Sequence, residues 1–276
     1  MTNNEIPQVS LSDSTSIPQL GYGVWQVPDD EAQGAVEHAL SVGYRMIDTA
    51  QAYENEAGVG RALRASGLSR DEVYVTTKLA NPDQGYDSTM RAYDESLARL
   101  GLETVDLYLI HWPLPSQDNY SATWKALVAL QEEGRVRSIG VSNFHEAHLD
   151  RIIDETGQAP VINQVEMHPY LQQAGLRAIN ADRGIVTQSY SPLGSGKGLL
   201  EDADLTALAE TKGVTTAQLV LAWHLALGVV TIPKSVTPAR IEENLGAAGV
   251  ELTEEELATI AALDRGVRFG GDPDKG

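Results

Sequence analysis

Seven short apolar runs in this chain are each followed at once by a polar side chain, and this spacing constrains the fold most. The runs have the length and the β-branched content of strands. The residues that follow them are Asp48, Lys78, His111, Ser142 with Asn143, Gln164, Tyr190 and Lys234. Helix-like segments separate most of the runs, and this alternation predicts parallel βαβ units. About eight such units close into a barrel of roughly 250 residues, whose carboxyl-end mouth gathers the functional side chains.

The other segments complete a predicted (β/α)8 TIM barrel. Residues 19–25 supply the first barrel strand, and residues 8–18 alternate around a polar turn, which predicts an N-terminal β-hairpin at the barrel bottom. The expected helices cover 29–42, 54–65, 88–100, 122–133, 145–155, 176–181, 205–212, 216–227, 238–246 and 254–263. Ser142 and Asn143 are candidate caps for the helix 145–155. Residues 264–276 predict a loop that can fold over the mouth. With no linker or composition break, residues 1–276 form one domain.

Composition excludes several classes of protein. The chain has 276 residues, 42% of them hydrophobic, which suits a globular core, and it has no cysteine for disulfides, thiolate zinc sites or thiol nucleophiles. A formal charge of −19 disfavours nucleic acid and anionic lipid as partners. No apolar run approaches the roughly 20 residues that span a bilayer, so we expect no membrane segment. The first residues do not resemble a signal peptide, which predicts a cytoplasmic protein.

Four of the predicted mouth residues suggest acid chemistry. A lysine at the end of a buried strand needs a counterion, and Asp48 is the obvious partner of Lys78. An ammonium beside a phenol lowers the phenol's pKa, so Lys78 would make Tyr53 a competent general acid. His111 can donate a hydrogen bond to a carbonyl oxygen at the same place. The set suits protonation of a carbonyl oxygen as it becomes an alkoxide.

A purely structural interpretation remains open for these four side chains. Asp48 and Lys78 would then be an ion pair between two strands, Tyr53 a loop aromatic and His111 a hydrogen-bonded core residue. Any one of them alone favours that interpretation. All four at one end of a barrel favour catalysis.

The chain resembles the aldo-keto reductases over nearly its whole length. The resemblance is carried by residues 43–50 with Tyr53, Asn55 and Glu56, and by 76–79, 105–113, 140–144, 163–169 and 232–235. It is strongest to the bacterial branch that includes 2,5-diketo-D-gluconate reductases. The family implies NADPH-dependent carbonyl reduction on an α/β barrel. It assigns Tyr53 as proton donor, Lys78 as the residue that lowers its pKa, Asp48 as the partner of Lys78 and His111 as substrate orienter.

The cofactor residues are predicted in the same way. Ser142, Asn143 and Gln164 can hydrogen-bond a carboxamide, and the ring of Tyr190 can stack on a nicotinamide. The polar and basic cluster around Lys234 suits an anion in so acidic a chain, and the family places the adenosine 2′-phosphate there. Alternatively, Arg240 pairs with Glu242 or Glu243 on its own helix. The predicted NADPH-binding set is Gly23, Val24, Ser142, Asn143, Gln164, Tyr190, Ser191, Leu193, Ser195, Ile232, Lys234, Ser235, Val236, Thr237, Arg240, Glu243 and Asn244.

The predicted substrate wall is largely apolar. It consists of Tyr22, Trp25, Leu79, Ala80, His111 and Trp112. Many relatives carry tryptophan where this chain has Ala80, and the diketogluconate reductases carry tryptophan where it has Tyr190. The enlarged apolar pocket favours hydrophobic dicarbonyls over charged sugar acids. The competing possibility is that Arg265 or Arg268 in the tail supplies a cation for a carboxylate.

Other functions fit the sequence less well. A Schiff-base aldolase would use Lys78 as its nucleophile, and a non-catalytic NADPH-sensing subunit would need only the nucleotide site. His145 and His148 are three residues apart rather than the four of the metalloprotease motif, so we predict no metal site. His168 is expected to be structural, and Trp223 and His224 to pack in the core. The expected partner is a small carbonyl compound, and the expected assembly is a monomer.

Overall fold

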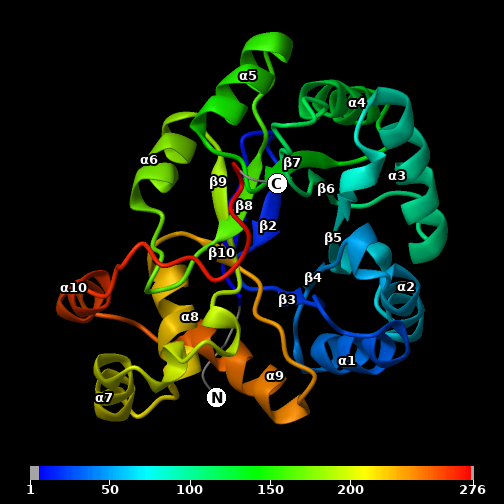
Figure 1. The fold of residues 1–276 in the computed structure, drawn as a ribbon. Coiled ribbons are helices and arrows are strands. Elements are labelled where there is room, and N and C mark those ends of the chain that lie inside the picture. Colours follow the sequence, from blue (N-terminus) through cyan, green and yellow to red (C-terminus); the bar gives the residue numbers. More distant parts are fainter. Residues whose placement is uncertain (1–5, 275–276) are drawn as a thin grey trace.

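Eight parallel strands curl into a barrel in the computed structural model, which describes residues 6–274 (Figure 1). In spatial and chain order these strands are β3 (Tyr22–Gly23), β4 (Met46–Asp48), β5 (Tyr74–Leu79), β6 (Leu107–Ile110), β7 (Ser138–Ser142), β8 (Ile162–Glu166), β9 (Val186–Tyr190) and β10 (Val230–Thr231). A parallel bridge between Leu20 and Thr231 joins the first strand to the last. The Gly21 N–H donates to Thr231 O at 2.9 Å, and the Thr231 N–H donates to Gln19 O at 2.8 Å. The predicted barrel is therefore confirmed, and it is closed.

Strand register gathers the predicted polar residues at one end. Asp48, the last residue of β4, pairs with Gly23 of β3 and with Thr76 of β5. Ser142, the last residue of β7, pairs with Gln164 of β8. The side chains that follow the apolar runs thus share the carboxyl end of the barrel, as parallel pairing requires.

Ten α-helices of the described chain surround the strands, and each lies within two residues of its predicted bounds. They are α1 (Asp29–Val42), α2 (Glu56–Ala65), α3 (Tyr86–Leu100), α4 (Tyr120–Glu132), α5 (Glu146–Thr156), α6 (Ala174–Asp182), α7 (Ala203–Lys212), α8 (Thr216–Ala226), α9 (Pro238–Leu245) and α10 (Glu254–Ala261). Tyr93, Trp124 and Phe144 are fully buried between helices and strands. Trp223 and His224 are buried in α8, as predicted. None of these helices is long and apolar enough to cross a membrane.

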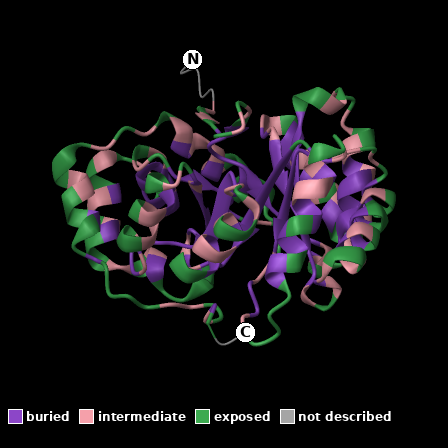
Figure 2. Cartoon of the chain, turned by 90° about the horizontal axis from the view of Figure 1, so that it is seen from above, coloured by how far each residue is buried: buried purple, intermediate pink, exposed green. Residues whose placement is uncertain are grey.

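The N-terminal hairpin lies at the amino end of the barrel, as predicted. Its strands β1 (Gln8–Ser10) and β2 (Ser16–Pro18) pair antiparallel. In the turn, Asp13 accepts a hydrogen bond from Ser138 Oγ at 2.6 Å, and Ser138 begins β7. Figure 2 shows this hairpin and the C-terminal tail at opposite ends of the molecule. The hairpin thus closes the amino end of the barrel, and the C-terminal tail lies at the mouth.

The cap of α5 differs from the prediction. His145 is the N-cap residue, and His148 Nδ1 accepts a hydrogen bond from the His145 N–H at 3.1 Å. Asn143 has a φ of +65°, in the left-handed region, so the chain must still turn before the helix begins. The two histidines therefore serve as a helix cap, and Ser142 and Asn143 remain directed to the mouth.

Close helix packing explains one glycine of α2. A Cβ built on Gly60 would lie 2.1 Å from Leu100 O, which is backbone and cannot move aside cheaply. Gly34 in α1 is exposed, and a Cβ there meets nothing within 4 Å. Alanine usually stabilises a helix interior relative to glycine. The contact with α3 reverses that preference for alanine at Gly60, whereas at Gly34 the preference holds.

We therefore expect Gly60→Ala to lower the free energy of unfolding by about 1–3 kcal/mol, because the added methyl overpacks the α2–α3 contact. Gly34→Ala should raise it by roughly 0.5–1 kcal/mol. Urea unfolding followed by circular dichroism measures both. Equal effects of the two substitutions would contradict the packing explanation.

Candidate active site

A buried ammonium lies at the centre of the mouth. Lys78, near the end of β5, is fully buried, and its Nζ donates to Asp48 Oδ1 at 2.5 Å and to Thr49 O at 2.9 Å. Its third contact is the hydroxyl of Tyr53, at 3.3 Å. Burial lowers the pKa of Lys78, but the charge of Asp48 and the hydrogen bonds raise it more, so the net pKa lies above its usual value. The lysine is therefore a fixed cation beside a phenol.

On its other side, Asp48 accepts a hydrogen bond from one side-chain amide, which is itself bound to a second amide. Gln164 Nε2 donates to Asp48 Oδ2 at 2.8 Å and to Gln188 Oε1 at 3.0 Å. Gln188 lies inside β9 and is fully buried, and its Nε2 has no hydrogen-bond partner among residues 6–274. Gln188 is not among the predicted site residues. The only signal was a polar residue inside an apolar run.

The pKa of Tyr53 moves opposite to the prediction. Tyr53 lies in the short 3-10 helix η1 (Gln51–Tyr53), which turns its ring back over the mouth. Burial raises the pKa of its hydroxyl, the charge of Lys78 lowers it, and Asp48 raises it again. The net pKa is above 10, so the predicted decrease toward neutrality is wrong in this structure. A phenol with a raised pKa keeps its proton at neutral pH, which is the form that can act as an acid.

His111 lies edge-on to the ring of Tyr53. The ring centroids are 5.6 Å apart and the ring planes meet at 73°. Burial, and then the charge of Lys78, lower the pKa of His111 to about 3. The imidazole is therefore neutral at physiological pH and offers one N–H donor. All four predicted catalytic side chains thus meet at one place.

Asn143 and Tyr190 form a second group across the mouth. Tyr190 Oη donates to Asn143 Oδ1 at 2.9 Å, and Asn143 Nδ2 donates to His111 O at 3.0 Å. Ser142 Oγ donates to Gln164 O at 2.8 Å. These contacts fix the side chains that were predicted to hold a nicotinamide.

The remaining predicted cofactor residues lie on neighbouring segments. Gly23 and Val24 end the first strand, Ser191, Leu193 and Ser195 follow β9, Ile232, Lys234, Ser235, Val236 and Thr237 follow β10, and Arg240, Glu243 and Asn244 lie in α9. Val24, Ile232 and Asn244 are at most 6% exposed, so their side chains offer little surface to a ligand. Gly23 packs against β10, where a Cβ would lie 3.0 Å from Ile232 O.

Two cations in this region have no partner. Lys234 and Arg240 are exposed, and neither makes an ion pair or a side-chain hydrogen bond within residues 6–274. The alternative pairing of Arg240 within its helix is wrong. Glu242 instead contacts His38 Nε2 at 3.1 Å, and Glu243 accepts from Thr215 Oγ1 at 2.8 Å. In a chain of charge −19, two unpaired cations in one place suit an anionic ligand.

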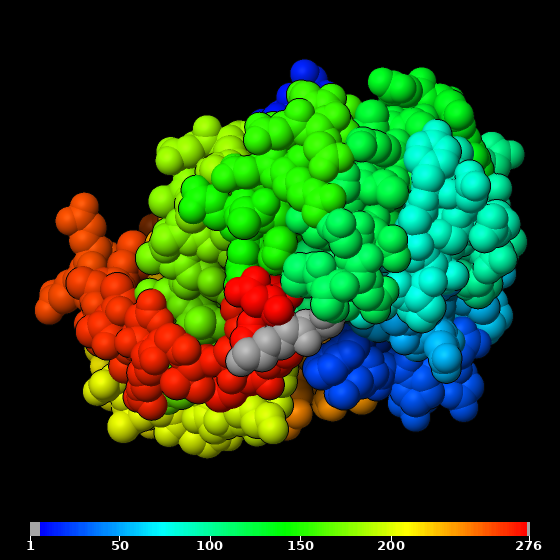
Figure 3. All heavy atoms as spheres, turned by 45° about the horizontal axis from the view of Figure 1, so that its top comes forward, coloured from blue at the N-terminus to red at the C-terminus, as the bar shows by residue number. Residues whose placement is uncertain are grey.

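The C-terminal tail crosses the mouth, as predicted (Figures 1 and 3). Figure 3 shows it as a red band that lies between green segments above and yellow segments below. The N–H groups of Phe269 and Gly270 donate to Glu166 Oε1 at 2.6 Å and Glu166 Oε2 at 2.8 Å. His168 Nε2 lies 3.0 Å from Glu166 Oε1, and the Phe269 ring stacks on His168. One buried carboxylate therefore holds the tail in place, and His168 is structural as predicted.

The tail cations are already paired. Arg268 Nη1 lies 3.9 Å from Glu166 Oε2. Arg265 lies over the ring of Tyr170 and contacts Asp202 Oδ2 at 3.3 Å. Arg265 is thus committed to Asp202, and Arg268 faces a carboxylate. Within residues 264–274, both arginines thus have a carboxylate close by, although Arg268 Nη1 makes no hydrogen bond.

The structure places the residues of the predicted substrate wall at different depths. Trp25 is 45% exposed, and Ala80 is 9% exposed after β5. A Cβ on Gly271 of the tail would lie 3.1 Å from the ring of Trp112, so the tail and Trp112 are in contact. Tyr22 and Leu79, each 1% exposed, belong instead to the main core and do not form an open wall. The hydroxyl of Tyr22 donates to Ser235 O and supports the loop after β10.

The low pKa of His111 makes a pH-dependent prediction. An unfolded histidine binds a proton below about pH 6.5, whereas folded His111 does so only near pH 3, so protons favour the unfolded chain between these values. We expect the free energy of unfolding to fall by about 1 kcal/mol per pH unit in this window on account of His111. His111→Gln should make the fall shallower in urea titrations at pH 7 and pH 5. The same slope in both proteins would contradict the assignment.

Comparisons with known proteins agree with this geometry. The family model described as Aldo/keto reductase family matches residues 18–265. A Yersinia pestis protein named methylglyoxal reductase DkgA is 52% identical over 269 residues, covering 97% of this chain and 96% of that protein. An aldo-keto reductase of Mycobacterium sp. (strain KMS) is 50% identical over 97% of this chain and 96% of its own length. Among solved structures, a mutant of Gox0644 in complex with NADPH has a TM-score of 0.95 and 46% identity, and 99% of each chain is covered.

Proposed function

The chain belongs to the aldo/keto reductase family, and we propose that it reduces small uncharged dicarbonyl compounds with Tyr53 as the proton donor. NADPH-dependent reduction of carbonyl compounds is its activity. The observation that carries the proposed mechanism is the Tyr53 hydroxyl, 3.3 Å from the buried ammonium of Lys78. A phenol beside a fixed cation can release its proton to a developing alkoxide.

The mouth residues fit NADPH. Tyr190 offers a flat ring, and Asn143 lies beside it with an amide held by three hydrogen bonds. The unpaired Lys234 and Arg240 would hold the 2′-phosphate that distinguishes NADPH from NADH. When bound, NADPH supplies a hydride to the carbonyl carbon.

The side chains of this chain supply the proton and the orientation. As the carbonyl carbon gains its new C–H bond, the π electrons of the C=O bond move onto the oxygen, which takes the proton of Tyr53. The ammonium of Lys78 stabilises the phenolate that remains, and Asp48 with Thr49 O fixes that ammonium. The neutral His111 donates its N–H to the same carbonyl oxygen and so orients the substrate.

Three observations support an uncharged dicarbonyl as substrate. Relatives at 50–52% identity are named methylglyoxal reductases, and methylglyoxal carries no charge. Of the predicted wall residues, the accessible Trp25 and Trp112 are apolar, and Ala80 is small and apolar. A substrate carboxylate near the tail would lie close to the carboxylate of Glu166. The charge of Glu166 already interacts with Arg268 and with the tail N–H groups. A carboxylate buried without a free partner is costly.

The two alternative functions are less well supported. A Schiff-base lysine must lose its proton to attack a carbonyl, but the contacts of Lys78 raise its pKa and leave it fully buried. A non-catalytic NADPH sensor would not require a proton donor, a fixed cation and a hydrogen-bonding imidazole at one place.

We also propose that the enzyme works as a cytoplasmic monomer. Each site residue named above comes from one chain, so the proposed chemistry needs no second copy. The acidic chain, of charge −19, disfavours nucleic acid as a partner.

Tyr53→Phe should lower kcat for methylglyoxal by about 10²–10⁴-fold, because it removes the proton donor. NADPH affinity, measured by fluorescence quenching, should stay within about threefold of wild type. Tyr86→Phe, a change at a tyrosine that is 45% exposed, is the control. A Tyr53→Phe enzyme with nearly wild-type turnover would refute the assignment.

Arg240→Ala should weaken NADPH binding by roughly 10- to 100-fold, because charge-assisted hydrogen bonds to phosphate contribute about 1.5–3 kcal/mol. NADH has no 2′-phosphate, so its affinity should change little. Isothermal titration of both cofactors measures the difference. Equal affinities of the wild-type enzyme for NADPH and NADH would place the phosphate elsewhere.

Substrate preference can be measured with phenylglyoxal and 4-carboxyphenylglyoxal, which differ in one carboxylate. We expect kcat/KM to be about tenfold or more higher for the uncharged compound, because the carboxylate lacks a free counterion. Arg268→Gln should leave that preference in place. A preference for the carboxylated compound that Arg268→Gln abolishes would instead make the tail cation the determinant of specificity.

A further inference from the structure

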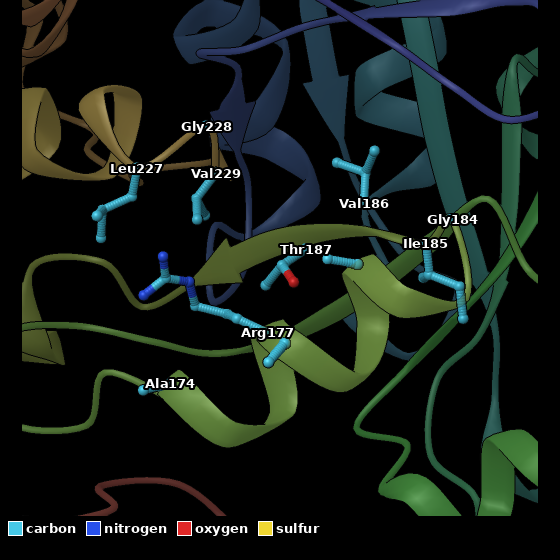
Figure 4. Close-up of a pocket in the computed structure, with 11 residues that line it drawn as sticks. Ala174, Arg177, Gly184, Ile185, Val186, Thr187, Leu227, Gly228 and Val229 are labelled. Atoms are coloured by element: carbon cyan, nitrogen blue, oxygen red, sulfur yellow. The ribbon is translucent and has the colours of Figure 1, made fainter.

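A groove of about 620 Å³ lies outside the barrel, far from the mouth (Figure 4). One wall is α6, and the other is formed by the beginning of β9 and by residues 227–229, which precede β10. Val186 lines the groove and is the first residue of β9, whereas Tyr190 is the last residue of that strand and lies in the mouth. The groove is thus at the amino end of the strands, opposite the proposed active site.

Apolar residues make up most of the groove's lining, and Thr187 and one cation are its polar side chains. Ile185, Val186, Leu227 and Val229 line it, and Arg177 is the only charged residue among its lining residues. Figure 4 shows the side chain of Arg177 extending from α6 toward Leu227 and Val229. A cavity of several hundred Å³ with apolar walls and one polar anchor is typical of small-molecule sites.

Arg177 has no counterion in the part of the chain that the structure describes. Its side chain is half-buried and makes neither an ion pair nor a hydrogen bond with residues 6–274. Arg183, just after α6, shows the contrast, since it contacts Asp150 Oδ1 at 2.5 Å and Glu146 Oε1 at 3.1 Å. The chain has 39 acidic and 20 basic residues, so carboxylates are abundant, and yet none within residues 6–274 pairs with Arg177.

These features select one class of ligand. A guanidinium offers a planar fork of N–H donors that matches a carboxylate. Arg177 is the only charged lining residue, so a singly charged carboxylate matches the groove better than a phosphate dianion does. The apolar walls suit a short aliphatic or aromatic body. We propose that this groove is a second binding site, for a small organic carboxylate with an apolar body, in which Arg177 holds the carboxylate.

Octanoate is a suitable probe, and octan-1-ol is its uncharged counterpart. Binding would be followed on the full chain, saturated with NADP⁺, by methyl NMR of labelled Ile, Leu and Val side chains. Methyl signals of Ile185, Val186, Leu227 and Val229 should shift, and those of Leu193 and Ile232 near the mouth should not. Octan-1-ol should bind at least about tenfold more weakly than octanoate.

Variants of the two arginines separate the proposal from simpler explanations. Arg177→Gln should weaken octanoate binding by about tenfold or more, and Arg177→Lys, which keeps the charge but not the fork, should lose less. Arg183→Gln, the matched control, should bind as the wild type does. Equal binding of octanoate and octan-1-ol would mean an apolar groove without an anion site, and unchanged binding by Arg177→Gln would overturn the proposal. Shifts confined to Leu193 and Ile232 would mean binding at the mouth only.

Discussion

The buried pair of Lys78 and Asp48 is the interaction on which the rest of the mouth depends. Both side chains are almost completely inaccessible to water, so each charge needs the other, and removing one partner of such a pair typically costs about 3–5 kcal/mol. The ammonium also takes Thr49 O and the hydroxyl of Tyr53 as acceptors. The same pair that joins two neighbouring strands therefore fixes the position of the phenol. The same side chains therefore contribute to the stability of the barrel and to the proposed chemistry.

A second buried carboxylate organises the opposite side of the mouth. Glu166 accepts two tail N–H groups and contacts His168 and Arg268. Asp48 and Glu166 are each surrounded by donors, so within residues 6–274 this side of the mouth carries no unpaired carboxylate. Lys234 and Arg240 remain unpaired. In the proposed function, the mouth thus has a nearly neutral side for the substrate and a cationic side for the nucleotide.

The sequence predicts the barrel and its four central side chains because both follow from local patterns. Strand-length apolar runs predict the alternation of strands and helices. The polar residue that follows each run indicates the end of the barrel where Asp48, Lys78 and His111 meet. The predictions are wrong where the outcome depends on how deeply a residue is buried or on the direction of its side chain. The pKa of Tyr53 depends on its burial in the folded chain, which no local pattern gives. Leu79 follows Lys78 in an alternating strand and so points to the helices, and Gln188 gains its role only from Gln164 on the next strand.

The bridge between Leu20 and Thr231 has a consequence for how the chain reaches this structure. The barrel closes only when strands from opposite ends of the chain meet, and such non-local pairings make folding slow. During synthesis the early strands emerge first and must wait with an open edge until the last strand is available. The N-terminal hairpin and helices α1–α8 can cover part of that open sheet meanwhile. Lys234 and Arg240, which we propose to hold the nucleotide phosphate, are among the last residues made, so the affinity of that proposed site would report completion of the barrel.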